Sequence, residues 1–394
     1  MTDRSTAFAQ RSEQKLVFDH KDMDYYLSWI VGRQAVEGSE PGECFETARG
    51  IVNADIASWQ QAWRQLAQKV EAEAEAALQQ GDREAARKAY LRASTYYRAP
   101  LFIMDPKEAA FREDWRKLHA CFQKAAPLFD PPIESVQVPY QGKLLDGYFW
   151  KVDNSAQKRP TLIVIGGIET FAEDCYFMIG PAGPQHGYNV ITADLPGQGV
   201  NPDQGLFMEP KSDLPIKAVV DYALTRSEID PERLALYGFS WGGHIVLKGA
   251  QYEPRLKALI ANPATSNIFR SALAQQGGND KSDPIGRMVF EQLAWRWGVQ
   301  LGNFFGRLGK AWGFLLHARA DPRQIQCPTL CMAGESEAAI TLKMTRACYE
   351  QLPHPQKKLV ILTQAQGGAA HCQVDNLPLL HQIVFGWLHE TLRP

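Results

Sequence analysis

The sequence lacks the features that would point to a membrane protein or a nucleic-acid-binding protein. No apolar run is long enough to span a bilayer, and the polar N-terminal stretch MTDRSTAFAQRSEQ has no hydrophobic signal region. The 42 Lys and Arg residues nearly balance the 44 Asp and Glu residues, so a net charge of −2 offers no attraction for nucleic acid or an anionic membrane. We therefore expect a cytoplasmic protein with no nucleic-acid or membrane partner.

Paired cysteines are also missing. The seven cysteines are odd in number, are scattered along the chain and include no C-x-x-C pair. This pattern is typical of reduced thiols in a cytoplasmic protein and argues against a disulfide framework. Cys327 and Cys331 flank one apolar run, where we expect them to fill the core.

Strand patterns are absent from the first third of the chain. Residues 55–82 and 83–99 each keep apolar residues at helical spacing, and a short Gly-Asp turn separates the two patterns. No second copy of this pair occurs, so a repeat array is not expected. Residues 1–132 are predicted to form a helical N-terminal domain.

From residue 133 onward, strand patterns alternate with helical segments. Residues 135–152 alternate in polarity around a Gln-Gly turn and predict a β-hairpin. Six further strands rich in Val, Ile and Leu are expected at 161–167, 188–197, 233–240, 256–264, 328–335 and 357–363. Apolar strands that alternate with helices predict a mostly parallel sheet covered on both faces, and hence an α/β core over residues 133–394.

One long helical stretch without a good strand pattern interrupts this core at about residues 265–320. It carries many aromatic residues: Trp295, Trp297, Phe304, Phe305, Trp312 and Phe314. Two interpretations are open, because the stretch is either a packed helical pair or a lid over a site, and a lid must also pack. Both predict a helical insertion between two core strands.

A G-x-S-x-G motif, Gly238-Phe239-Ser240-Trp241-Gly242, lies between a strand pattern and a helix pattern. In so tight a turn, glycines leave space where a Cβ would clash, and the serine is held in a strained conformation that presents its Oγ. The helix N-terminus that follows favours developing negative charge. We therefore expect Ser240 to be a nucleophile rather than a capping serine in a glycine-rich turn.

A serine hydroxyl needs a base to take its proton, and nine histidines are available. His371 follows the last expected strand after a loop of small residues, QAQGGAAHCQVDN, which can bend towards the nucleophile. The other histidines lie in helical or loop segments that predict structural or surface positions. We expect His371 to be the general base.

The acid that fixes the tautomer of the base should stand between the nucleophile and the histidine in chain order. The loop after the strand that precedes the last one, residues 332–340, reads MAGESEAAI and contains Glu335 and Glu337. Asp321 lies ahead of this strand and Asp375 lies beyond the histidine, so neither fits the order.

The loop after the first parallel strand, IGGIET, is expected to form an oxyanion hole. Gly166 and Gly167 let backbone N–H groups approach a reacting oxygen, and Ile168 follows at the usual donor position. The N–H of Trp241 is expected to be the second donor. Two interpretations of Glu169 are open: it is a charge at a helix N-terminus, or it binds substrate or orients the loop.

These motifs resemble the α/β-hydrolase superfamily over roughly residues 135–394, with the run ADLPGQG in support. Four stretches are similar to the subgroup with a helical N-terminal cap: ARKAYLRASTYYRA, GGIET, GYNVITADLPGQG and GGAAHCQ. That subgroup includes dihydroxypseudooxynicotine hydrolase, the fermentation–respiration switch proteins and polyketide-shortening hydrolases of pigment pathways. The resemblance implies a mostly parallel sheet of the eight-stranded type, a cap over residues 1–132 and a helical lid insertion.

The resemblance also implies roles for single residues. The family's triad acid, usually aspartate, lies at a position that Glu337 matches, three residues after Gly334. Glu335 is the competing acid, and a glutamate in place of aspartate is a departure from the family. On the cap, Tyr97 and Arg98 match the family's LRAS-YYR run, where they either bind the substrate or pack at the domain interface.

Several members of this subgroup cleave a carbon–carbon bond beside a ketone, with serine chemistry and without a metal or cofactor. The resemblance therefore implies a Ser-His-Glu hydrolase that performs a retro-Claisen cleavage on an aromatic or polyketide-like small molecule. A carboxylic ester or thioester hydrolase is the alternative, because the same triad does either reaction. A non-catalytic binding protein on a hydrolase scaffold is a second alternative. Helical caps in this group commonly dimerise, which implies a homodimer by analogy only.

Overall fold

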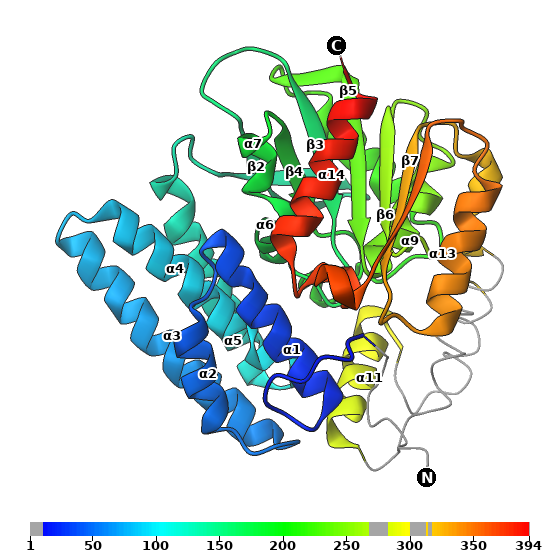
Figure 1. Cartoon of the computed structure of the whole chain (residues 1–394). Coiled ribbons are helices and arrows are strands. Elements are labelled where there is room, and N and C mark those ends of the chain that lie inside the picture. Colours follow the sequence, from blue (N-terminus) through cyan, green and yellow to red (C-terminus); the bar gives the residue numbers. More distant parts are fainter. Residues whose placement is uncertain (1–10, 268–282, 300–312, 314–316, 394) are drawn as a thin grey trace, which may run out of the picture. The chain divides into compact units, whose positions relative to one another are not determined.

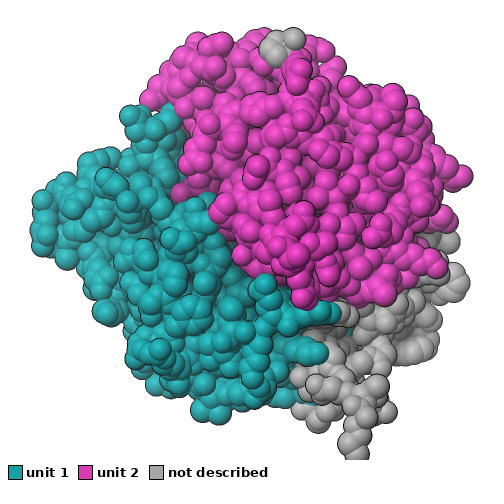
Figure 2. Space-filling view, in the orientation of Figure 1, with its two compact units in different colours: residues 1–133, 275–292 teal, residues 134–274, 293–394 magenta. Residues whose placement is uncertain are grey.

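The chain divides into two compact units. The computed structural model describes residues 11–267, 283–299, 313 and 317–393 (Figure 1). Unit 1 comprises residues 1–133 and 275–292, and unit 2 comprises residues 134–274 and 293–394 (Figure 2). Part of the expected insertion, residues 275–292, therefore groups with the N-terminal helices and not with the sheet.

Unit 1 is helical in the residues that the structure describes. Its helices are α1 (Lys21–Gly32), α2 (Pro41–Arg49), α3 (Ile56–Gln79), α4 (Arg83–Arg98), α5 (Ala109–Ala125) and the first part of α11 (Pro284–Arg296). Short 3-10 turns accompany them at η1 (Arg33–Val36), η2 (Pro100–Ile103) and η3 (Ala126–Leu128).

Aspartate side chains cap the N-termini of α3 and α4. Asp55 accepts a hydrogen bond from the Ser58 N–H at 2.8 Å, and Asp82 accepts one from the Ala85 N–H at 2.9 Å. Each bond satisfies an N–H group that has no partner within its helix. Large aromatic side chains fill the interior of the unit, among them Tyr26, Trp59, Trp63, Tyr90 and Tyr96.

Unit 2 is built on an eight-stranded sheet in the order β1-β2-β4-β3-β5-β6-β7-β8. The strands are β1 (Glu134–Tyr140), β2 (Lys143–Trp150), β3 (Arg159–Ile165), β4 (Asn189–Ala193), β5 (Ile229–Phe239), β6 (Ala258–Asn262), β7 (Thr329–Gly334) and β8 (Lys357–Leu362). Strand β2 runs antiparallel to β1 and β4, and the other neighbouring pairs are parallel. The mostly parallel sheet expected from the sequence is confirmed.

Helices cover both faces of this sheet. Every residue of β4, β6 and β7 is buried, and successive side chains of a strand point to opposite faces, so both faces must be covered. Within the described residues, the α-helices of the unit are α6 (Ala172–Ile179), α7 (Ala182–Gln185), α8 (Asp213–Ala223), α9 (Trp241–Ala250), α13 (Ala339–Gln351), α14 (Leu377–Thr391) and the last turn of α11. In the described part of the chain, no helix is both long and apolar enough to cross a membrane.

Only part of the expected insertion lies within the described residues. Helix α11 forms there, and the boundary between the two units passes through it after Gln292. Trp295 and Trp297 belong to the described segment. The other four aromatic residues named in the sequence analysis lie outside the described residues: Phe304, Phe305, Trp312 and Phe314.

Candidate active site

Ser240 stands in the turn between β5 and α9, at the carboxyl end of a central strand. Its backbone has φ 58° and ψ −129°, a region that residues with a Cβ rarely adopt. The Ser240 N–H donates to the Asn262 carbonyl at the end of neighbouring β6, at 2.7 Å. The adjacent strand therefore holds the strained residue in place.

The glycines of the motif make this turn possible. A Cβ on Gly238 would lie 2.2 Å from the carbonyl oxygen of Gly242. A Cβ on Gly242 would lie 2.4 Å from the carbonyl oxygen of Ile165, at the end of β3. Because side chains cannot approach backbone so closely, the turn accepts only glycine at these two positions.

His371 lies next to Ser240. Its Nε2 is 2.9 Å from Ser240 Oγ, which is hydrogen-bond distance. The two residues after it, Cys372 and Gln373, both have positive φ angles, and Gln373 Oε1 accepts a hydrogen bond from Asn262 Nδ2 at 2.7 Å. Asn262 thus holds Ser240 through its carbonyl and the histidine loop through its side chain.

Glu337 lies on the other side of the imidazole. Glu337 Oε1 is 2.6 Å from His371 Nδ1, and the glutamate side chain is only 4% exposed. Glu335 has different partners, because its N–H donates to the Leu362 carbonyl at 2.8 Å and its carboxylate accepts the Gln364 N–H at 3.2 Å. Glu337 therefore contacts the histidine, whereas Glu335 hydrogen-bonds to the loop after β8.

The surroundings of His371 favour its charged form. Burial by itself lowers the pKa of His371, but the neighbouring Cys372 and the Glu337 carboxylate outweigh burial and raise the pKa well above its ordinary value. With Nδ1–H donated to Glu337, Nε2 can accept a proton from Ser240 Oγ. The three side chains can therefore move a proton from the hydroxyl to the imidazole and stabilise the imidazolium.

Two of the residues expected to form the oxyanion hole, Gly167 and Trp241, lie beside Ser240. A Cβ on Gly167 would be 3.0 Å from Ser240 Oγ, so the backbone at Gly167 passes directly beside the hydroxyl. Ile168 is partly buried against the core, and Trp241 is the first residue of α9, where a backbone N–H has no partner within the helix. Glu169 follows in the same loop and is half-buried.

Trp297, the residue directly after α11, makes an aromatic contact with Trp241. The ring of Trp297 lies 5.9 Å from the ring of Trp241 in an edge-on arrangement. Trp297, near the C-terminal end of α11, therefore packs on the residue that follows the serine. In the sequence, the only indication of this contact is the large number of aromatic residues in the insertion.

The cap residues Tyr97 and Arg98 are buried inside unit 1. The Tyr97 hydroxyl donates to Glu71 Oε2 at 2.8 Å. The Arg98 guanidinium lies over the ring of Phe102, 3.9 Å from its centre. The neighbouring Tyr96 hydroxyl donates to a carboxylate of α2. These contacts give the run a packing role within its own unit, and a role in substrate binding stays a prediction.

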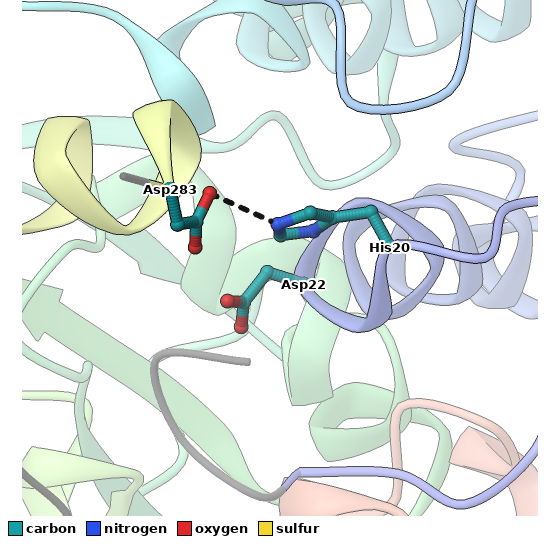
Figure 3. A group of neighbouring side chains, drawn as sticks. All are labelled: His20, Asp22 and Asp283. Atoms are coloured by element: carbon teal, nitrogen blue, oxygen red, sulfur yellow. Dashed lines mark hydrogen bonds and ion pairs between the residues drawn. The ribbon is translucent and has the colours of Figure 1, made fainter. Parts of the chain in front are cut away.

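One group in unit 1 has the composition of a metal site. Among the described residues, the possible ligand atoms of His20, Asp22 and Asp283 lie within 4.8 Å of one another (Figure 3). They already have protein partners: His20 Nε2 is 3.2 Å from Asp283 Oδ1, and Arg11 donates to Asp22 at 2.5 Å. His20 Nδ1 also accepts the Met23 N–H at 3.4 Å, which places the ring proton on Nε2. These contacts describe a structural cluster.

Comparisons with known proteins agree with this fold. The model of a family described as esterase FrsA-like matches residues 28–303. The chain is 30% identical to hydrolase ORFZ of Pyricularia oryzae, with 95% of this chain and 97% of that protein covered. It is 28% identical to 20-hydroxy-prefusarin hydrolase FUS2 of Gibberella moniliformis, with the same coverage. The crystal structure of 2,6-dihydroxy-pseudo-oxynicotine hydrolase aligns with a TM-score of 0.74 at 22% identity, covering 92% of this chain and 95% of that one.

Proposed function

Because the chain belongs to the family of FrsA-like esterases, we propose that Ser240, His371 and Glu337 are the catalytic triad of a serine hydrolase. The α/β-hydrolase fold and the assignment as a hydrolase are shown by the relatives. The proposal for the triad rests on one observation above all. His371 bridges Ser240 Oγ and Glu337 Oε1 at 2.9 and 2.6 Å, although the three residues come from three different loops.

The reaction would begin with proton transfer from Ser240 to His371 as Oγ attacks a substrate carbonyl. The oxygen of that carbonyl becomes an oxyanion, which the N–H groups of Gly167, Ile168 and Trp241 would stabilise. Glu337 keeps the His371 ring in the tautomer that accepts the serine proton and then stabilises the imidazolium.

We further propose that the substrate is a ketone or β-dicarbonyl compound and that a carbon–carbon bond is cleaved. Collapse of the tetrahedral adduct would expel the neighbouring carbon as an enolate, which takes the proton held by His371. The acyl group stays on Ser240 Oγ until water, activated by the same histidine, releases it as a carboxylic acid. Water is the only co-reactant. The relative named as a 20-hydroxy-prefusarin hydrolase supports a small organic substrate.

An ester substrate is the alternative, and the membership of the chain in a family of FrsA-like esterases favours it. The same attack on an ester carbonyl expels an alcohol in place of an enolate. The two reactions differ only in the leaving group, so the triad geometry is equally suited to both. The choice between them therefore requires a measurement of products.

Incubation with an aryl ester and, separately, with 1-phenyl-1,3-butanedione distinguishes the two reactions. Carbon–carbon cleavage yields an acid and a ketone, which chromatography with mass spectrometry identifies. We expect these products from the wild-type protein and none from Ser240→Ala. Rapid cleavage of many aryl esters without cleavage of any aromatic diketone would contradict the carbon–carbon proposal and favour the esterase.

A further inference from the structure

A buried glutamine lies behind the loop that carries two of the proposed oxyanion donors. Gln198, in the turn after β4, is 1% exposed. Its Nε2 donates to the carbonyl of Gly166 at 2.6 Å and to the carbonyl of Gly167 at 2.8 Å. Its Oε1 accepts the Leu195 N–H at 2.9 Å. Since two acceptors face Nε2 and one donor faces Oε1, only this orientation of the amide satisfies all three contacts.

Thr170 makes a second contact to the same loop. Its Oγ1 donates to the Gly167 carbonyl at 2.9 Å, so this carbonyl accepts two side-chain hydrogen bonds. The carbonyl of Thr170 in turn accepts the Gly199 N–H at 2.9 Å. The turn that contains Gln198 therefore donates hydrogen bonds to the oxyanion loop both from a side chain and from a backbone N–H.

These carbonyls determine where the N–H groups point. A trans peptide unit is planar, and its C=O and N–H bonds point in opposite directions. The Gly166 carbonyl belongs to the same peptide unit as the Gly167 N–H, and the Gly167 carbonyl belongs to that of the Ile168 N–H. Because Gln198 binds both carbonyls, the N–H groups of Gly167 and Ile168 point to the opposite side of the loop. Gly167 is the residue whose backbone passes beside Ser240 Oγ.

An arginine supports the turn around Gln198. Arg296, at the end of α11, is fully buried. Its guanidinium donates to the carbonyl of Gly197 at 2.9 Å and to that of Gly199 at 3.4 Å. The backbone on each side of Gln198 is thus held by the same cation, which restricts where the glutamine side chain can lie.

We propose that Gln198 is a positioning residue of the oxyanion hole: it orients the peptide units of Gly167 and Ile168 before the substrate binds. Thr170 shares the second of these contacts. This inference rests on the proposed function, because an oxyanion forms only if Ser240 attacks a carbonyl or an equivalent centre. Gln198 itself does not touch the reacting atoms.

The test is the rate of phosphonylation of Ser240 by a fluorophosphonate probe. The phosphoryl oxygen of this probe occupies the oxyanion hole, and no substrate needs to be known. Gln198→Met keeps the length of the side chain and removes its hydrogen bonds. Because loss of a whole oxyanion donor costs about 100- to 1,000-fold in rate, we expect misalignment to slow labelling by about 10- to 100-fold. The pH at half-maximal rate should not move, because His371 is unchanged.

Three further variants separate positioning from a general effect on folding. Thr170→Val should slow labelling by about 10-fold, whereas Thr170→Ser, which keeps the hydroxyl, should restore the rate to near that of wild type. Gln251→Met removes an exposed amide contact far along the chain and should leave the rate unchanged. In every folded variant, labelling should still reach completion, because a positioning residue alters the rate constant and not the fraction of active protein.

Two results would overturn the inference. One is an unchanged rate constant in both Gln198→Met and Thr170→Val. The other is a loss of final labelling, with an unchanged rate constant for the remaining active protein, which assigns Gln198 to folding alone. If Gln198→Met does not fold, the labelling rates of Thr170→Val and Thr170→Ser test the inference instead. A wild-type protein that is folded but never labelled refutes the proposed function itself, which is a different outcome from either.

Discussion

Glu337 Oε1 and His371 Nδ1 lie 2.6 Å apart, a distance typical of a short, charge-assisted hydrogen bond. The glutamate reaches the ring from the loop after β7, where an aspartate would carry one methylene less. Its side chain is nearly fully buried, so water competes little for this contact. The relationship distinguishes Glu337 from Glu335, which hydrogen-bonds to the loop after β8.

Glu337→Gln should keep the fold and reduce kcat by about 10,000-fold. An amide in this position no longer enforces the tautomer in which Nε2 accepts the serine proton. Glu335→Gln is the matched control, since it removes one charge from the same loop, and its kcat should stay within a few-fold of wild type. Steady-state kinetics of the two variants measure this difference, with circular dichroism to verify folding. A large loss of kcat in Glu335→Gln with a mild effect in Glu337→Gln would assign the acid to Glu335.

The rate should rise with pH. The neutral form of His371 is the base, and this form predominates only above its pKa, which Cys372 and Glu337 raise above the ordinary value against the lowering effect of burial. The acidic limb of kcat/KM should therefore have its midpoint above about 6.5. In Glu337→Gln one raising charge is gone, so the midpoint of the residual activity should move to lower pH. A midpoint that moves upward in this variant would contradict the account.

His244 should make folding stability depend on pH. Burial lowers the pKa of His244 to about 4, and its Nδ1 lies 2.8 Å from the Thr265 carbonyl. In the unfolded chain His244 takes up a proton near pH 6.5, whereas in the folded protein it does so only near pH 4. The folding stability present above pH 6.5 is therefore lost progressively as the pH falls towards 4. The loss is roughly 3 kcal/mol over this window. Urea denaturation at several pH values should show a flatter profile for His244→Gln, and an equal slope in both proteins would refute this assignment.

Tyr97→Phe should lower stability and leave the kinetics intact. The Tyr97 hydroxyl donates to the buried Glu71 carboxylate, and loss of a hydrogen bond to a charged group costs about 1.5 to 3 kcal/mol. Tyr252→Phe, at a side chain that is 57% exposed, is the control and should change neither property. Thermal denaturation measures the first effect. A raised KM without loss of stability would show that Tyr97 binds substrate.

Local patterns in the sequence were sufficient to predict the sheet and to select Ser240 and His371 as candidates. Buried parallel strands carry apolar residues on both faces, so their pattern is strong. The chain order of the fold selects His371 and limits the acid to the loop with Glu335 and Glu337, and the family resemblance favours Glu337 within it. The G-x-S-x-G motif predicts a tight turn because only glycine fits where backbone approaches backbone. The positive φ of Ser240 agrees with that reasoning.

The supporting residues could not be predicted because their roles depend on distant backbone. Gln198 bonds to carbonyls about 30 residues earlier in the chain, and the Asn262 side chain meets Gln373 across 111 residues. Nothing in ADLPGQG or LIANPA marks these amides as buried. The grouping of α11 was missed for the same reason, since Gln292 bonds to the carbonyls of the segment around Leu101, 191 residues earlier.

The central claim is that Ser240 is a nucleophile activated by His371. Treatment of the folded protein with a fluorophosphonate probe, followed by mass spectrometry of the digested chain, tests it most directly. The account predicts one adduct per chain on the peptide that contains Ser240, no adduct in Ser240→Ala, and labelling slowed by orders of magnitude in His371→Ala. A folded wild-type protein without an adduct, or with an adduct on another residue, would contradict it.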